Sequence, residues 1–367
     1  MAPVLRRALI LALSVATGTG VFLADIATGS EISLSFLYLV PVALATWFLG
    51  RRAGLLLAGL SAAGWVAAYL ETGHLYSAPH ILYWNATVEL ATFCAVALAL
   101  SRVRSGLDRE RALARRLEQA YRLLDREQQQ VGSLQRRLLP AEPPEIPGYA
   151  IAVHYATSAR AGGDYYDFFP LPRGRLGILV ADASGHGTPA AVVMAIMRAL
   201  LHTAPDTLDS PEHALAALNT RLIGNLPPGS FATACYAALD PATGSIEYAL
   251  GGHHPALLVR GADGSVESLT SPDGLPLGVW PAATFSSQSA RLACGDTLLV
   301  FTDGLIEARS PEGALFGEDP VRRLLAAHRQ AEPEDIQQRL LEALSAHAGR
   351  RPLEDDLTLV LIRSLRP

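Results

Sequence analysis

Four long apolar stretches occupy the first hundred residues, and they constrain the fold more than any other feature of this sequence. They span residues 5–23, 34–49, 53–70 and 81–100. Each is close to the ~20 residues that an α-helix needs to cross a bilayer, and the second is the shortest. The chain is 50% hydrophobic, yet most of its charged residues come after Arg102. The sequence therefore predicts a membrane module over residues 1–101, formed by four transmembrane helices, and a polar remainder.

Arginines lie only at those ends of the apolar stretches that would face the same side of a membrane. They are Arg6, Arg7, Arg51, Arg52, Arg102 and Arg104. The connecting segments 24–33 and 71–80 contain no Lys or Arg. Because basic residues remain on the cytoplasmic side, we expect a multi-pass protein of the cell (inner) membrane with both termini in the cytoplasm.

A secretory signal peptide is the alternative for the first stretch, with Arg6 and Arg7 as its basic region. Its removal would place the loop at Arg51 and Arg52 and the C-terminal part on inconsistent sides of the membrane. Four retained helices are the simpler account.

The segment 102–139 is highly charged and contains apolar residues spaced alternately by four and three. These are Leu113, Leu117, Ala120, Leu124, Val131, Leu134 and Leu138, with Glu127 at the remaining position. Such heptads predict a coiled-coil signalling helix and a parallel homodimer. The alternative is a single amphipathic helix laid against the next domain. Prolines from Pro140 onward end this helix, so a further domain is expected over residues 140–367.

Overall charge and cysteine spacing exclude two classes of function. A formal net charge of -5 gives no basic field, so nucleic acid is not an expected partner. Cys94, Cys235 and Cys294 lie far apart and show no CxxC spacing, which favours neither a disulfide framework nor a zinc site.

The C-terminal part contains short segments rich in β-branched residues and longer amphipathic segments. Predicted strands are 151–155, 176–181, 232–239, 246–250, 256–259 and 297–302, and predicted helices are 189–202, 211–223, 320–328 and 333–347. Because strands and helices do not alternate regularly, we expect an α+β fold, a sandwich of two antiparallel sheets flanked by helices.

Aspartates recur beside glycines or at the ends of the predicted strands. Asp164 follows two glycines, and Asp182 and Asp303 end apolar strands. Asp355 and Asp356 open a further strand, the last in the chain. A single such Asp could simply cap a turn. Several together would repel one another unless cations neutralised them, and an oxygen-only ligand set suits Mg²⁺ or Mn²⁺ better than zinc.

Seven segments resemble a known family. They are GGDYYDF from Gly162, VADASGHGTPAAVVMA from Val180, FATACYAALDPATG from Phe231, GGHHPALLV from Gly251, GLPLGV from Gly274, CGDTLLVFTDGLIEAR from Cys294 and DDLTLVLIR from Asp355. In this order they resemble PPM-type metal-dependent serine/threonine protein phosphatases, specifically the bacterial branch that includes the sporulation stage II phosphatase E. The resemblance covers residues 138–363, and the QRRLLP run before it resembles the helix that enters such domains.

The resemblance implies two divalent cations, Mn²⁺ or Mg²⁺, that activate water for attack on phosphoserine or phosphothreonine. Asp182 would bridge both cations, the Ala183 carbonyl would add an oxygen, and Asp303 and Asp355 would complete the set. Asp164 would bind metal directly or through water, which makes Asp164, Asp182 and Asp303 the expected catalytic residues. Asp356 competes with Asp355 as the last ligand, and we favour Asp355.

The sequence departs from the family's pattern at two positions. Ser184 stands where the eukaryotic branch has a histidine proposed as general acid, and His186 is displaced by two residues, so no acid is assigned. Ala183 replaces the usual glycine and requires an ordinary backbone conformation. His253 and His254 are expected to form structural hydrogen bonds or to contact substrate.

The resemblance further implies a phosphorylated regulatory partner of the anti-sigma-factor-antagonist type. A catalytically inert phosphoprotein-binding module is the alternative, but it would require a broken ligand set. A diguanylate cyclase is disfavoured because Tyr165 and Tyr166 follow GGD. The sequence contains neither a P-loop nor an HRD motif, so no motif indicates a kinase.

Overall fold

The computed structural model describes residues 3–29, 32, 34–72, 78–272, 274–349 and 351–365. Two compact units divide the chain, residues 1–121 and 122–367. The helix α4 (Pro79–Arg136) contributes residues to both units.

The first unit contains the four apolar helices predicted from the sequence. They are α1 (Pro3–Thr28), the pair η1 (Ser35–Tyr38) and α2 (Leu39–Leu49), α3 (Arg51–Glu71), and the start of α4. Within the described residues, three of these helices, α1, α3 and α4, are long and apolar enough to cross a membrane. The pair η1 and α2 covers only Ser35–Leu49, which corresponds to roughly 22 Å of helix, less than the ~30 Å of a hydrocarbon core.

Small residues allow the helices of the first unit to pack closely. A Cβ atom on Gly54 of α3 would overlap the Thr46 hydroxyl of α2. Tyr38, Val42 and Phe93 are fully buried in the apolar core of the same unit. Close approach at small residues is the usual way in which apolar helices associate in lipid.

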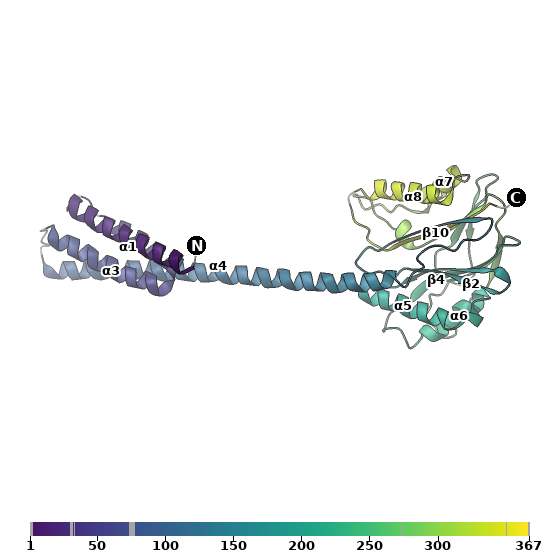
Figure 1. The fold of residues 1–367 in the computed structure, drawn as a ribbon, viewed down its shortest axis with the longest axis horizontal. Helices are drawn as coiled ribbons and strands as arrows, with labels where there is room; N and C mark the ends of the chain where they lie inside the picture. Colours follow the sequence, from purple (N-terminus) through teal and green to yellow (C-terminus); the bar gives the residue numbers. More distant parts are fainter. Residues whose placement is uncertain are drawn as a thin grey trace. The chain divides into compact units, whose positions relative to one another are not determined.

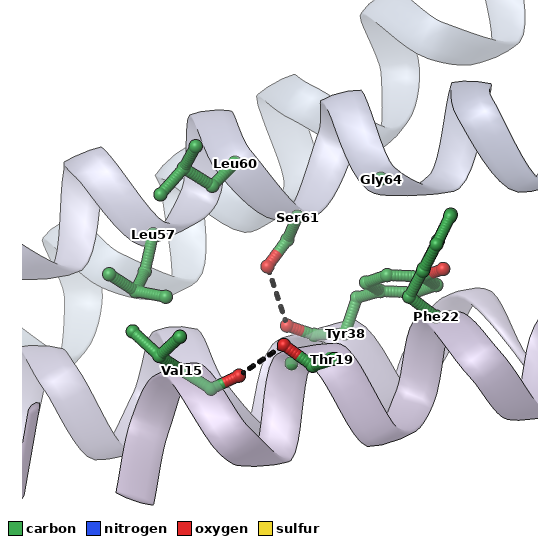
Figure 2. A pocket seen from close by; sticks show the side chains of 9 residues that line it. Val15, Thr19, Phe22, Tyr38, Leu57, Leu60, Ser61 and Gly64 are labelled. Carbon is green, nitrogen blue, oxygen red and sulfur yellow. Dashed lines mark hydrogen bonds between the residues drawn. The ribbon is translucent and has the colours of Figure 1, made fainter. Parts of the chain in front are cut away.

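A cavity of about 220 Å³ lies in the first unit, between α1, η1 and α3. Figure 2 shows its lining, which is Val15, Gly18, Thr19, Phe22, Tyr38, Leu57, Leu60, Ser61 and Gly64. The hydroxyls of Thr19 and Ser61 donate hydrogen bonds to the backbone carbonyls of Val15 and Tyr38. The cavity is therefore mainly apolar.

The second unit is a sandwich of two five-stranded sheets whose named strands all pair antiparallel. One sheet has the order β1 (Tyr149–Ala156), β10 (Leu357–Ser364), β9 (Thr297–Phe301), β6 (Ala256–Val259), β7 (Val266–Leu269). The other has the order β2 (Tyr165–Pro170), β3 (Leu176–Ala183), β4 (Ala232–Asp240), β5 (Ser245–Gly251), β8 (Gln288–Arg291). Between them lies a core that includes Ile178, Leu258 and Val360.

Helices cover the outer faces of both sheets (Figure 1). The pair α5 (Thr188–His202) and α6 (Pro211–Leu222) packs on β3, β4 and β5, and the pair α7 (Glu318–Ala327) and α8 (Pro333–Ala348) packs on the other sheet. A second core, around Leu299, Leu340 and Leu359, lies under α7 and α8. The predicted α+β sandwich of two antiparallel sheets with outer helices is confirmed.

Three strands were absent from the sequence prediction. The segment YYDFFP of β2 shows no alternation of apolar and polar residues, and its Asp and Pro are unusual in strands. β7 and β8 are four-residue edge strands rich in polar residues. Short polar edge strands protect sheets against pairing with other chains, and they carry little hydrophobic signal.

α4 extends the connector predicted from the heptads. It ends at Arg136, a few residues before Pro140. The side chains of Leu113, Leu117 and Leu124 on the predicted seam are 66%, 57% and 57% exposed. One chain by itself therefore leaves these leucines in contact with solvent.

Candidate metal centre

Five aspartates from both sheets meet at one end of the sandwich. Asp164 precedes β2, and Asp182 lies at the end of β3. Asp303 follows β9 and begins the short η4 helix (Asp303–Leu305), while Asp355 and Asp356 precede β10. Because β2 pairs antiparallel with β3, and β9 with β10, the start of one strand lies beside the end of its neighbour. The aspartates therefore lie at the same end of each sheet.

Asp182 lies within interaction range of all the other four carboxylates. Burial, followed by the charges of Asp303, Asp355 and Asp356, raises its pKa to about 8. A side-chain hydrogen bond with Asp164 acts in the opposite direction. The structure thus brings together all the aspartates that the sequence singled out.

Asp164 is the most deeply buried of the group, at 1% exposure. Burial, followed by the charge of Asp182, raises its pKa well above the usual range. Its Oδ2 accepts hydrogen bonds from the hydroxyls of Thr302, at 2.8 Å, and Thr358, at 2.6 Å, which favour the ionised form. Both threonines, which the sequence analysis missed, lie on the strand ends that carry Asp303 and Asp356.

The two adjacent aspartates before β10 have different surroundings. Asp356 is 2% exposed, and its carboxylate accepts hydrogen bonds from the backbone N–H groups of Ser158, at 2.8 Å, and Gly163, at 2.6 Å. Asp355 is half-buried and accepts one hydrogen bond from the Asp356 N–H, at 2.8 Å. Burial raises the pKa of Asp355, and the charges of Asp356 and Glu307 add to the effect. The Asp356 carboxylate thus accepts more hydrogen bonds from the protein than the Asp355 carboxylate does.

Backbone approaches these carboxylates only because glycines stand beside them. A Cβ atom on Gly163 would overlap the Ala183 carbonyl oxygen, and one on Gly162 would overlap the Asp356 carboxylate. The Ala183 backbone also keeps an ordinary conformation, because Arg173 is the only non-glycine residue with positive φ among the described residues. The Ala183 carbonyl is therefore placed beside Asp182 without strain, as the sequence analysis expected.

A second group of donors adjoins Asp303. Ligand atoms of His254, Asp303 and Glu307 lie within 4.8 Å of one another. Burial and the charges of Asp355 and Glu307 raise the pKa of Asp303, while His254 acts in the opposite direction. Sequence analysis missed Glu307, although its position four residues after Asp303, with its N–H bonded to the Asp303 carbonyl at 2.8 Å, places it on the same turn.

The remaining histidines near the centre differ in burial. His253 is buried, and its ring nitrogens bond the Thr233 hydroxyl and the Phe301 carbonyl at 2.8 and 3.0 Å. Burial lowers its pKa to about 3, which fits a neutral structural residue. His186 is exposed on the loop after Asp182, close enough to act electrostatically on Asp355.

The donor set fits hard divalent cations. Four aspartates, Asp164, Asp182, Asp303 and Asp355, together with the Ala183 carbonyl, offer oxygen atoms only. In the part of the chain that the structure describes, no Arg or His side chain forms an ion pair with any of the five aspartates. Buried carboxylates without cationic partners favour Mg²⁺ or Mn²⁺ between them.

Comparisons with known proteins agree with this geometry. A family model described as Stage II sporulation protein E (SpoIIE) matches residues 172–365, more than half of the chain. The chain is 26% identical over 231 residues to the phosphoserine phosphatase RsbU of Bacillus subtilis, covering 63% of this chain and 68% of RsbU. It is 25% identical to the phosphoserine phosphatase RsbP of the same bacterium, covering 57% of this chain and 51% of RsbP.

Solved structures share the fold of the second unit. The RsbU and RsbW domains of Rv1364c from Mycobacterium tuberculosis match with 34% identity and a TM-score of 0.53, over 61% of this chain and 62% of that one. The SiaA-PP2C domain of Pseudomonas aeruginosa matches in fold with a TM-score of 0.59 at 20% identity, over 66% of this chain and 98% of that one. The chain therefore belongs to the SpoIIE family, and its C-terminal domain is a PP2C-type protein serine/threonine phosphatase.

Proposed function

We propose that the chain is a membrane-anchored phosphatase that hydrolyses phosphoserine or phosphothreonine in a regulatory protein by means of a water activated by two divalent cations. The observation that carries this proposal is the position of Asp182, which interacts with all four other carboxylates of the centre. A carboxylate so placed is suited to bridge two cations.

The residues divide the work as follows. Asp182 and the Ala183 carbonyl would hold cations at the end of β3, and Asp303 and Asp355 would hold them from the other sheet. Asp164, fixed by Thr302 and Thr358, adds a ligand directly or through water. Asp356, bonded to Ser158 and Gly163, instead orders the loop that carries Asp164.

The cations, when bound, lower the pKa of water and stabilise the phosphoryl oxygens. The protein's part is to hold carboxylates that neutralise the cations and to keep their geometry fixed on strand ends. No side chain has to act as nucleophile. The centre thus supports direct attack of water on the phosphate ester.

We further propose the organisation predicted from the sequence. Residues 1–101 form a four-helix membrane module with both termini in the cytoplasm, 102–139 a coiled-coil connector, and 140–367 the phosphatase domain. Support comes from the three helices long enough to span a bilayer and from the exposed leucines on α4. A parallel homodimer would cover these leucines.

The names of the relatives support a proposal for the substrate class. Two of them are named phosphoserine phosphatases. A solved structure similar to this domain contains RsbU and RsbW domains in one protein. We propose a phosphorylated anti-sigma-factor antagonist as the substrate, so that dephosphorylation would alter transcription.

Phosphate release from a phosphoserine antagonist protein tests this function. The full-length chain in detergent should release phosphate when Mn²⁺ or Mg²⁺ is present, and Asp182→Asn and Asp303→Asn should each lower kcat by at least about 100-fold. Binding of the phosphoprotein without turnover, under any divalent cation, would instead identify an inert phosphoprotein-binding module.

A further inference from the structure

The last turn of α4 carries a buried glutamine that is bonded to the backbone of the metal centre's loop. Gln135 is 4% exposed. Its Nε2 donates a hydrogen bond to the Gly162 carbonyl at 2.7 Å, and its Oε1 accepts one from the Gly162 N–H at 3.0 Å. The side-chain amide thus uses its donor and its acceptor on a single residue, much as a neighbouring β-strand would.

The helix surface around Gln135 is shaped for this contact. Gly132 lies one turn earlier, and a Cβ atom there would overlap the Arg160 carbonyl oxygen. Further along, the Arg160 guanidinium pairs with the Asp125 carboxylate at 2.9 Å, in an exposed position. Residues 125–135 of α4 therefore dock along the segment 160–162.

That segment continues directly into Gly163 and Asp164 of the metal centre. The Gly163 N–H donates to the Asp356 carboxylate at 2.6 Å, and the Gly163 carbonyl accepts from the Ala183 N–H at 3.2 Å. Asp164 follows directly in the chain. A shift of Gly162 would therefore move Gly163 and Asp164, and it would disturb the hydrogen bonds that join Gly163 to Asp356 and to the Ala183 N–H.

We propose that Gln135 is a positioning residue of the metal centre, so that docking of the last turns of α4 sets the affinity of the site for divalent cations. The inference rests on the proposed two-metal function and deepens it. Because linkage is reciprocal, cation binding also stabilises the docked helix end.

The test is a titration of the full-length protein in detergent with Mn²⁺, in which electron paramagnetic resonance measures the concentration of free Mn²⁺. Gln135→Ala should raise the Kd for Mn²⁺ about tenfold, because two hydrogen bonds to the loop are lost. Activity should recover at saturating Mn²⁺. Gln128→Ala, at an exposed glutamine two turns earlier on the same helix, is the matched control and should leave the Kd unchanged.

Gly132→Ala separates docking from helix stability. Alanine strengthens an isolated helix relative to glycine, yet here its Cβ would block the contact with Arg160. A raised Kd in this variant therefore supports docking as the cause. Hydrogen exchange on the unmodified protein gives a readout that needs no variant, since Mn²⁺ should slow exchange over residues 130–136.

The outcomes separate the two proposals. Wild-type Mn²⁺ affinity in Gln135→Ala, or unchanged exchange at the end of α4 on Mn²⁺ binding, overturns the role of Gln135 and leaves the metal centre intact. Absence of Mn²⁺ binding by the wild-type protein overturns the two-metal function, and this inference with it.

Discussion

At the scale of single residues, the glycines of the centre matter as much as the carboxylates. Gly163 lies so close to Ala183 and Asp182 that a side chain there has no space. Its N–H also fixes the Asp356 carboxylate. The centre is therefore built by backbone close to charge, which only glycine allows at these positions.

Gly163→Ala should lower activity at least about tenfold while the domain still folds. The methyl group would push against the Ala183 carbonyl, and overpacking of this kind costs about 1–3 kcal/mol. Steady-state phosphatase assays should show at least about a tenfold loss in kcat/KM at fixed Mn²⁺. Gly274→Ala is the control, because no atom lies within 4 Å of the added Cβ. Equal activity of the two variants would contradict the packing argument.

At the scale of elements, the sequence predicted the strands whose hydrophobic pattern is strong. β6 was located at 256–259 as the structure has it, and β1, β3, β4, β5 and β9 lay within three residues at each end. β2 was missed because its Asp and Pro are unusual in strands, and the edge strands β7 and β8 because their residues are mainly polar. Continuous apolar runs reveal fully buried strands such as β3, β6 and β9, whereas strands that contain polar residues or proline are hidden.

The same distinction applies to the site. The aspartates could be found from sequence because each stands at a strand end or beside glycine. Thr302, Thr358 and Ser158 could not, because their role depends on contacts between chain segments far apart in sequence. Gln135 belongs to the QRRLLP run, but its bond to Gly162 spans 27 residues. Only the fold reveals such partners.

The seam of α4 gives a prediction at the element scale. Leu117→Glu should convert the proposed dimer to a monomer, because a charge would replace an apolar seam residue. Leu123→Glu is the matched control, since Leu123 is 59% exposed on the same helix but lies off the seam. Sedimentation equilibrium of the full-length chain in detergent measures the mass. A monomeric wild type, or a dimer that survives Leu117→Glu, would contradict the coiled coil.

At the scale of the whole molecule, cation binding and folding of the second unit should be linked. The buried carboxylates repel one another, and cations bind them only in the folded state. At about 100 times the Kd, Mn²⁺ should add about 2.7 kcal/mol of stability. This raises the Tm of the phosphatase domain by roughly 5–10 °C. Calorimetry with EDTA or Mn²⁺ measures the shift, and an equal shift in Asp182→Asn would argue for cation sites elsewhere.

The central claim is that four aspartates from two sheets, Asp164, Asp182, Asp303 and Asp355, hold two divalent cations in one site, while Asp356 orders the loop beside them. Equilibrium dialysis of the full-length protein against Mn²⁺ counts the bound ions. We predict two tightly bound Mn²⁺ per chain in the wild type and fewer in Asp182→Asn. Asp263→Asn is the control and should again bind two, because Asp263 is an exposed turn residue outside the centre. No bound Mn²⁺ in the wild type, or an unchanged count in Asp182→Asn, would contradict the account.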